Sequence, residues 1–172
     1  MIIGMNPLTF IHVVISLVAI ATGFVALYGL LNNKRLETWT TIFLATTVAT
    51  SVTGFLFPFV KFLPSHAFGI SSLLILPVAY YARYVQRLVG RWRWVYIISA
   101  MLALYLNVFV LIVQAFLKIQ VLHDLAPTQQ EPPFLIAQLA NLVIFMTLTI
   151  LAIKRFQPVQ VVPGNTGEIR TA

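Results

Sequence analysis

Cysteine is absent from the 172 residues of this chain, and charged residues make up only 9% of the composition. The absence of cysteine excludes disulfides, thiolate metal sites and cysteine nucleophiles. The scarcity of charge excludes an ordinary soluble domain, in which about a quarter of the residues are charged. Because 60% of the residues are hydrophobic and fall in long runs, the composition indicates a protein that crosses a membrane several times.

Five apolar runs are each long enough for a helix to cross the hydrocarbon core of a bilayer, which is about 30 Å thick. We predict spanning helices over residues 8–31, 38–60, 66–89, 94–117 and 134–153. The predicted fold class is all-α, a polytopic membrane helix bundle with five transmembrane helices. The bundle forms a single unit over residues 1–155, and the polar residues 156–172 are expected to be a disordered cytoplasmic tail.

Small residues form one seam of the first predicted helix. His12, Ser16, Ala19, Gly23 and Ala26 recur at alternating spacings of four and three, which places them on one face. Small side chains let helices approach closely in lipid. The seam therefore predicts a tight helix contact, with His12 pointing into the bundle near one membrane surface.

The inner end of the third predicted helix combines basic and aromatic residues. Pro77 is expected to kink this helix, because proline removes one backbone hydrogen bond. Arg83 and Arg87 are close enough to the helix end to extend their charged groups to water. Three tyrosines accompany them and fit an interfacial aromatic belt: Tyr80, Tyr81 and Tyr84.

The distribution of basic residues sets the expected orientation. On one side of the bundle the helix ends carry Lys34, Arg35, Arg83, Arg87, Arg91, Arg93, Lys154 and Arg155, and on the other side Lys61 and Lys118. Basic residues gather on the cytoplasmic side of membrane proteins. We therefore expect the N-terminus outside and the C-terminus in the cytoplasm, and the net charge of +7 does not require a nucleic-acid partner.

All three histidines fall on the expected outer side of the bundle. Imidazole suits zinc, copper and iron, so His12, His66 and His123 are candidate metal ligands. His12 and His66 lie at similar depth and could be axial ligands of one haem. The sequence has no HExxH or CxxCH motif, and each histidine could equally be an interfacial or capping residue.

Amide side chains add to this outer polar content. Asn107 and Gln114 share one face of the run 94–117, and Gln138 and Asn141 share one face of the run 134–153. A buried amide in hydrocarbon needs a partner, so we expect these groups to converge with histidines on one cavity or packed polar core. The candidate cofactor-binding residues are His12, His66, Asn107, Gln114, Gln138 and Asn141. The alternative is that the amides join neighbouring helices through hydrogen bonds.

Two functional hypotheses follow. The first is a non-catalytic integral membrane protein, an accessory or structural subunit of a membrane complex or a small self-associating bundle. The alternative is a redox or small-ligand-binding bundle that uses the outward cluster for haem, metal, quinone or lipid. Catalysis is disfavoured, because no nucleophile-elbow motif occurs. No Asp or Glu lies inside a predicted span, which disfavours a proton-coupled transporter. The expected partners are the lipid bilayer and other membrane subunits or a second copy.

Three stretches resemble small uncharacterised multi-pass membrane proteins of bacteria. They are IHVVISLVAIATGFVALYGLL, LNVFVLIVQAFLK and LAPTQQEPPFLIAQL, in the first, fourth and fifth predicted spans. The last stretch is the most distinctive. The resemblance implies a bacterial inner (plasma) membrane protein and carries no established activity.

Overall fold

The computed structural model is helical throughout the residues that it describes, which are 6–56 and 64–157, with side chains described for all of these except 64–67. Its elements are α1 (Pro7–Leu31), α2 (Glu37–Gly54), α3 (Pro64–Tyr80), the π-helical turn η1 (Tyr81–Val85), α4 (Trp92–Lys118), α5 (Gln120–Leu125) and α6 (Pro132–Arg155). The expectation of an all-α bundle is confirmed.

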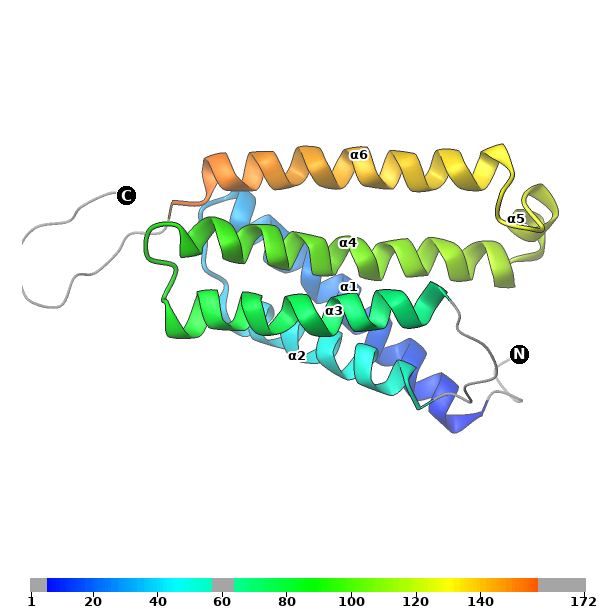
Figure 1. Ribbon diagram of the computed structural model, residues 1–172, viewed down its shortest axis with the longest axis horizontal. Helices are drawn as coiled ribbons and strands as arrows, with labels where there is room; N and C mark the ends of the chain where they lie inside the picture. The colour runs from blue at the N-terminus through cyan, green and yellow to red at the C-terminus, as the bar shows by residue number, and fades with distance from the viewer. Residues whose placement is uncertain (1–5, 57–63, 158–172) are drawn as a thin grey trace, which may run out of the picture.

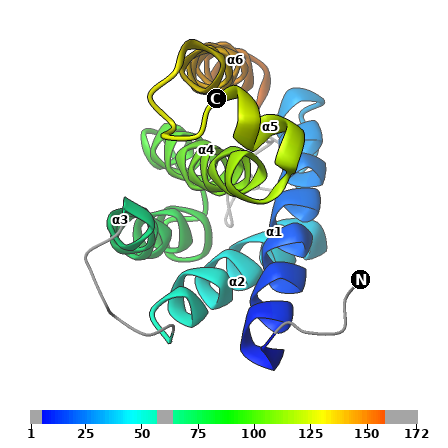
Figure 2. The same cartoon turned by 90° about the vertical axis from the view of Figure 1, so that its right-hand side faces the viewer.

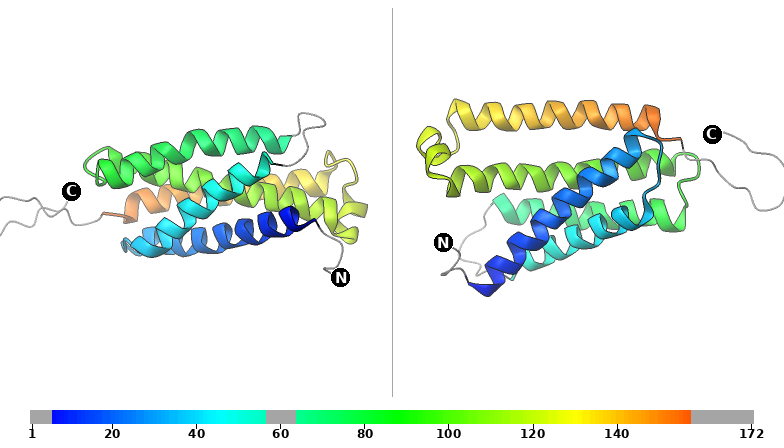
Figure 3. Two further views of the ribbon diagram at one scale, coloured as in Figure 1. Left: turned by 90° about the horizontal axis from the view of Figure 1, so that it is seen from below. Right: turned by 180° about the vertical axis from the view of Figure 1, so that it is seen from behind.

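Helix α4 lies at the centre of the bundle and contacts every other long helix. Figures 1 and 2 show α2 and α3 on one side of α4 and α6 on the other, while α1 crosses obliquely beside α2. The N-terminal half of α1 diverges from α4 and α6, as Figure 3 shows from behind. The helices are therefore close together at the end where α1 joins α2, and they are splayed at the opposite end.

Four helical segments are long and apolar enough to cross a membrane: α1, the stretch Phe68–Val85 of α3 and η1, α4 and α6. These segments indicate a membrane protein. Helix α2 is not one of them, although the run 38–60 predicts a spanning helix there. The described helix ends at Gly54 and its threonines dilute its apolar character, while residues 57–60 lie outside the described part of the chain.

The connections on either side of α4 differ from the prediction. The run 66–89 predicts a helix that continues through residue 89, but η1 ends at Val85. Arg87, Leu88 and Gly90 then take φ angles of 48°, 64° and 55°, which a right-handed helix does not allow. This turn reverses the chain into α4. After α4, the connection between the predicted spans 94–117 and 134–153 contains the short helix α5.

The predicted small-residue seam of α1 packs into the core around α4. Ala19, Gly23 and Ala26 are buried. A Cβ atom on Gly23 would lie 2.5 Å from Cδ1 of Leu104 and 2.9 Å from Cε2 of Phe43. The missing side chain therefore allows α1 to approach α2 and α4 closely, as expected for helices in lipid.

Local hydrogen bonds define both ends of α1. At its start the Leu8 amide donates to the side-chain oxygen of Asn6 at 3.0 Å, which satisfies one of the free amides of the first turn. At its end Asn33 takes a left-handed φ of 55°, and the Lys34 amide donates to the Gly29 carbonyl at 2.8 Å. This is a Schellman motif, in which a left-handed residue closes the helix.

The chain directly after α6 is packed against the bundle. Phe156 is 0% exposed, and Nη1 of Arg93 donates to its carbonyl oxygen at 2.8 Å. The Gln157 amide donates to the side-chain oxygen of Asn33 at 2.8 Å. The tail predicted to be disordered from residue 156 is therefore anchored over its first two residues, and residues 158–172 lie outside the described part.

Candidate functional site

His12 lies at the contact between α1 and α2. Its Nδ1 atom is 2.8 Å from the hydroxyl oxygen of Thr53, near the end of α2. The ring is half-buried, so the histidine points into the bundle as predicted. This contact joins α1 to α2.

Asn107 makes a similar contact deeper in the bundle. Its side-chain nitrogen donates to the hydroxyl of Thr47 at 3.1 Å, which links α4 to α2. Thr47 is fully buried. The amide therefore has the partner that a polar group in an apolar interior requires.

Both amides of α6 are buried in the bundle. Nε2 of Gln138 donates to the carbonyl of Phe109 at 3.3 Å, and Gln138 and Asn141 are both buried. Within the described residues, Oε1 of Gln138 and Nδ2 of Asn141 have no hydrogen-bond partner. These two buried atoms keep unused hydrogen-bonding capacity.

The structure does not gather the predicted polar residues into one cavity. Gln114 is exposed whereas Gln138 is buried, so the described residues do not place Gln114 in one packed core with Gln138. The physical reason is the splay of the bundle: α1 and α2 diverge from α4 and α6 towards this end (Figures 1 and 3). His12 therefore contacts α2 and Gln138 contacts α4.

The predicted metal ligands are also placed on separate elements. His123 lies in α5, and the side chain of His66 falls outside the described residues. Within the part of the chain that the structure describes, no group of three His, Asp or Glu residues is arranged to hold a metal ion.

The loop between α5 and α6 is organised by Glu131. Desolvation raises the pKa of this carboxyl, but hydrogen bonds from the Thr128 hydroxyl and from the Thr128 and Gln130 amides outweigh it and leave the pKa below its ordinary value. A carboxyl with a lowered pKa stabilises the fold above its unfolded pKa and loses this contribution as the pH falls through its folded pKa. The loop should therefore loosen only under acidic conditions.

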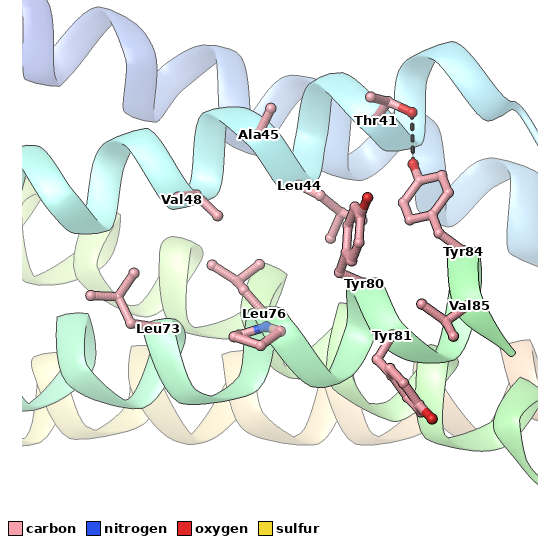
Figure 4. A pocket seen from close by; sticks show the side chains of 11 residues that line it. Thr41, Leu44, Ala45, Val48, Leu73, Leu76, Tyr80, Tyr81, Tyr84 and Val85 are labelled. Carbon is pink, nitrogen blue, oxygen red and sulfur yellow. Dashed lines mark hydrogen bonds between the residues drawn. The ribbon is translucent and has the colours of Figure 1, made fainter.

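A groove of about 690 Å³ runs between α2 and α3. Figure 4 shows its aliphatic walls and the tyrosines of α3 and η1 at one end. The lining residues are Thr41, Leu44, Ala45, Val48, Leu73, Leu76, Pro77, Tyr80, Tyr81, Tyr84 and Val85. Tyr84 and Thr41 are joined across the groove by a hydrogen bond of 2.7 Å between their hydroxyls. The groove is thus apolar along its length and hydroxyl-bearing at one end.

Arg83 lies beside the hydroxyl-bearing end of the groove. Its side chain is 3% exposed and forms an ion pair of 2.6 Å with Glu37, whose side chain is 59% exposed. The same Nη2 atom donates to the carbonyl of Arg35 at 2.9 Å. The guanidinium also lies 5.7 Å from the ring of Tyr84 and 5.1 Å from that of Tyr96. Arg83 therefore joins η1 to α2 and α4.

Arg83 and its neighbouring tyrosines lie in a π-helical turn. The Gln86 amide donates to the Tyr81 carbonyl at 3.0 Å, five residues back, so this turn is wider than an α-helical one. Tyr81 and Tyr84 line the groove, while Arg83 is buried against α2 and α4. Wide turns of this kind often occur at functional sites.

Sequence reasoning missed the role of Arg83. A basic residue near the end of a predicted span was expected to reach water, and Arg87 is indeed exposed while Arg83 is buried. The available signal was the scarcity of acids: the chain has only 4 Asp and Glu residues, and Glu37 is the one next to a basic turn. An acid in that place is a natural partner for a buried arginine.

No protein-family model matches this chain, and no curated protein and no solved structure matches it either. The functional interpretation therefore depends on the residues and distances described above.

Proposed function

We propose that this chain is a non-catalytic integral membrane protein that serves as an accessory or structural component of a membrane assembly. The proposal is based on the polar side chains inside the bundle, which form contacts between helices. His12, Asn107, Gln138 and Arg83 each bind a residue of a neighbouring helix. Such contacts hold helices together in lipid, where burying apolar surface gives no driving force for helix association.

The face of α6 that points away from α4 and α1 is available to an assembly partner. This helix packs mainly on α4 and α1, and its opposite face is apolar and exposed. The exposed residues include Leu135, Ile136, Leu139, Val143 and Met146. We propose that lipid, another membrane subunit or a second copy of the chain covers this face.

We further propose that α2 is a fifth crossing and that the protein belongs to a bacterial inner membrane. Helix α2 packs along α1 and α3, and the start of α1 and the end of α6 lie at opposite ends of the bundle in Figure 1. The turn after α1, the turn after η1 and the end of α6 share the end that carries most of the basic residues. By the preference of basic residues for the cytoplasm, the N-terminus is outside.

Single cysteines should test this topology, because the chain has no cysteine of its own. In intact spheroplasts a membrane-impermeant maleimide should label Lys61→Cys and Gln130→Cys. It should label Lys34→Cys only after the membrane is permeabilised, because that turn faces the cytoplasm. If Lys34→Cys and Lys61→Cys react from the same side, α2 does not cross the membrane and the five-span proposal is wrong.

The alternative function is a redox or small-ligand-binding bundle, and one observation favours it. The unpartnered amide atoms of Gln138 and Asn141 could bind a small polar group between α4 and α6. An absorbance spectrum and metal analysis of the purified protein should separate the two proposals. We expect no haem absorbance and no stoichiometric metal, because His12 contacts α2 while His123 lies in α5, and the described His, Asp and Glu residues form no group of three that could hold a metal ion. A Soret band or one bound metal ion per chain would overturn the non-catalytic proposal.

A further inference from the structure

The groove between α2 and α3 lies on the outside of the bundle. Its described lining comes only from α2, α3 and η1, and none of it comes from α4, which packs behind α3. Val48, Tyr80 and Tyr81 line the groove and are exposed. In a membrane this groove is therefore open to the surrounding lipid, and its volume of about 690 Å³ is within the usual range of small-molecule sites.

The length of the groove matches one leaflet of a bilayer. Its lining extends from Leu73 to Val85, which corresponds to about 18 Å at about 1.5 Å per residue. The hydrocarbon core is about 30 Å thick, so each leaflet contributes about 15 Å. A partner transmembrane helix would need a groove along the whole core, whereas a lipid chain needs only one leaflet.

Charge favours an anionic headgroup at the tyrosine end. Arg87 follows the groove residue Val85 and is exposed, and Arg35 is exposed beside the buried Arg83. Glu37 is the acid described at this end, and its carboxylate is already paired with Arg83. Two exposed arginines therefore lie close in the chain to the residues at the tyrosine end of the groove, Arg87 two residues after Val85 and Arg35 two residues before Glu37. Basic groups at a membrane surface attract anionic lipids.

From these observations we infer that the groove binds one acyl chain of an anionic phospholipid, drawn from the leaflet at the basic end of the bundle. The chain lies against the aliphatic side chains of α2 and α3. The phosphate lies at the tyrosine end, near the hydroxyls of Tyr80 and Tyr84, which Figure 4 shows side by side, and within reach of Arg87. This inference is independent of whether the protein serves as an accessory subunit.

Photolabelling of the full-length protein in nanodiscs should test the inference. The probe is phosphatidylglycerol with a photoreactive group in one acyl chain, and mass spectrometry locates the labelled peptides. We expect labelling concentrated on α2 and α3.

The substitution Ala45→Phe should reduce this labelling about tenfold, because a tenfold loss of affinity requires the loss of burial of only about two methylene groups of the lipid chain. Ala45 is exposed and lines the groove, and Ala140→Phe places the same ring on the exposed face of α6 as a control.

A second pair of variants tests the headgroup. Unlabelled phosphatidylglycerol should compete with the probe better than phosphatidylcholine does, and Arg87→Gln should reduce that preference about fivefold. Arg155→Gln removes an exposed charge at the end of α6 and should leave the preference unchanged. Labelling equal on α6 and on α2 and α3, or equal competition by both lipids, would overturn the inference. The inference would also be wrong if Ala45→Phe changed the oligomeric state of the protein without reducing the labelling. The groove would then bind a second copy of the chain.

Discussion

Replacing Arg83 with alanine should lower the free energy of unfolding of the bundle by about 2–4 kcal/mol. The side chain makes two charge-assisted contacts from Nη2, to Glu37 and to the carbonyl of Arg35, and it lies over the rings of Tyr84 and Tyr96. Alanine would remove all of these contacts and leave a cavity where η1, α2 and α4 meet. Thermal unfolding in detergent, followed by tryptophan fluorescence, measures the loss.

The matched control is Arg91→Ala, which removes an exposed arginine from the neighbouring turn. It should change stability by no more than about 0.5 kcal/mol. Arg83→Lys should recover only part of the loss, because an ammonium group cannot reproduce the planar guanidinium over the tyrosine rings. Equal stability of Arg83→Ala and Arg91→Ala would show that the buried arginine does not hold these helices together.

Replacing Gly29 with alanine should destabilise the protein by about 1–2 kcal/mol, although alanine is the better helix former by about 1 kcal/mol. A Cβ atom at this position would lie 2.8 Å from the carbonyl oxygen of Lys34 and 2.9 Å from Cδ1 of Leu36. The first of these atoms belongs to the backbone of the turn and cannot rotate away. The turn would have to open, which would weaken the bond from the Lys34 amide to the Gly29 carbonyl.

Gly54→Ala is the control for this substitution. Gly54 is also helical, and among the described residues a Cβ atom there would meet only Cε1 of His12 at 3.7 Å, an ordinary van der Waals distance. We expect this variant to be neutral or stabilised by up to about 1 kcal/mol. The two substitutions should therefore shift the melting temperature in opposite directions. A shift of the same sign in both would mean that the turn between α1 and α2 is not closely packed.

The sequence was most informative where one helix could be considered alone. Length and lack of charge located α1, α4 and α6, and the spacing of Ala19, Gly23 and Ala26 identified the buried face of α1. These properties depend only on residues within a few turns of each other. The threonine-rich α2 gave a weaker signal, and the π-helical turn gave none.

Predictions that required knowledge of the opposing helix were less accurate. His12 and Gln138 were each placed facing protein, but the sequence does not show that α1 diverges from α4 and α6. Their partners are consequently Thr53 and the carbonyl of Phe109. Arg83 and Glu37 are separated by 46 residues, and no local pattern relates them. The candidate groove arises from the same long-range packing and could not be predicted.

The direction in which the Arg83 side chain points depends on how many residues the wide turn η1 contains, as well as on which residues they are. Each α-helical residue rotates the side-chain direction by about 100°, and a π-helical turn takes up one residue more than an α-helical turn. Deleting Ala82, the residue between Tyr81 and Arg83, would remove the extra residue of this turn and point the side chain of Arg83 in another direction. A descendant of this protein could thus lose the arginine contact with α2 through one three-base deletion, with Glu37 and the arginine codon both intact.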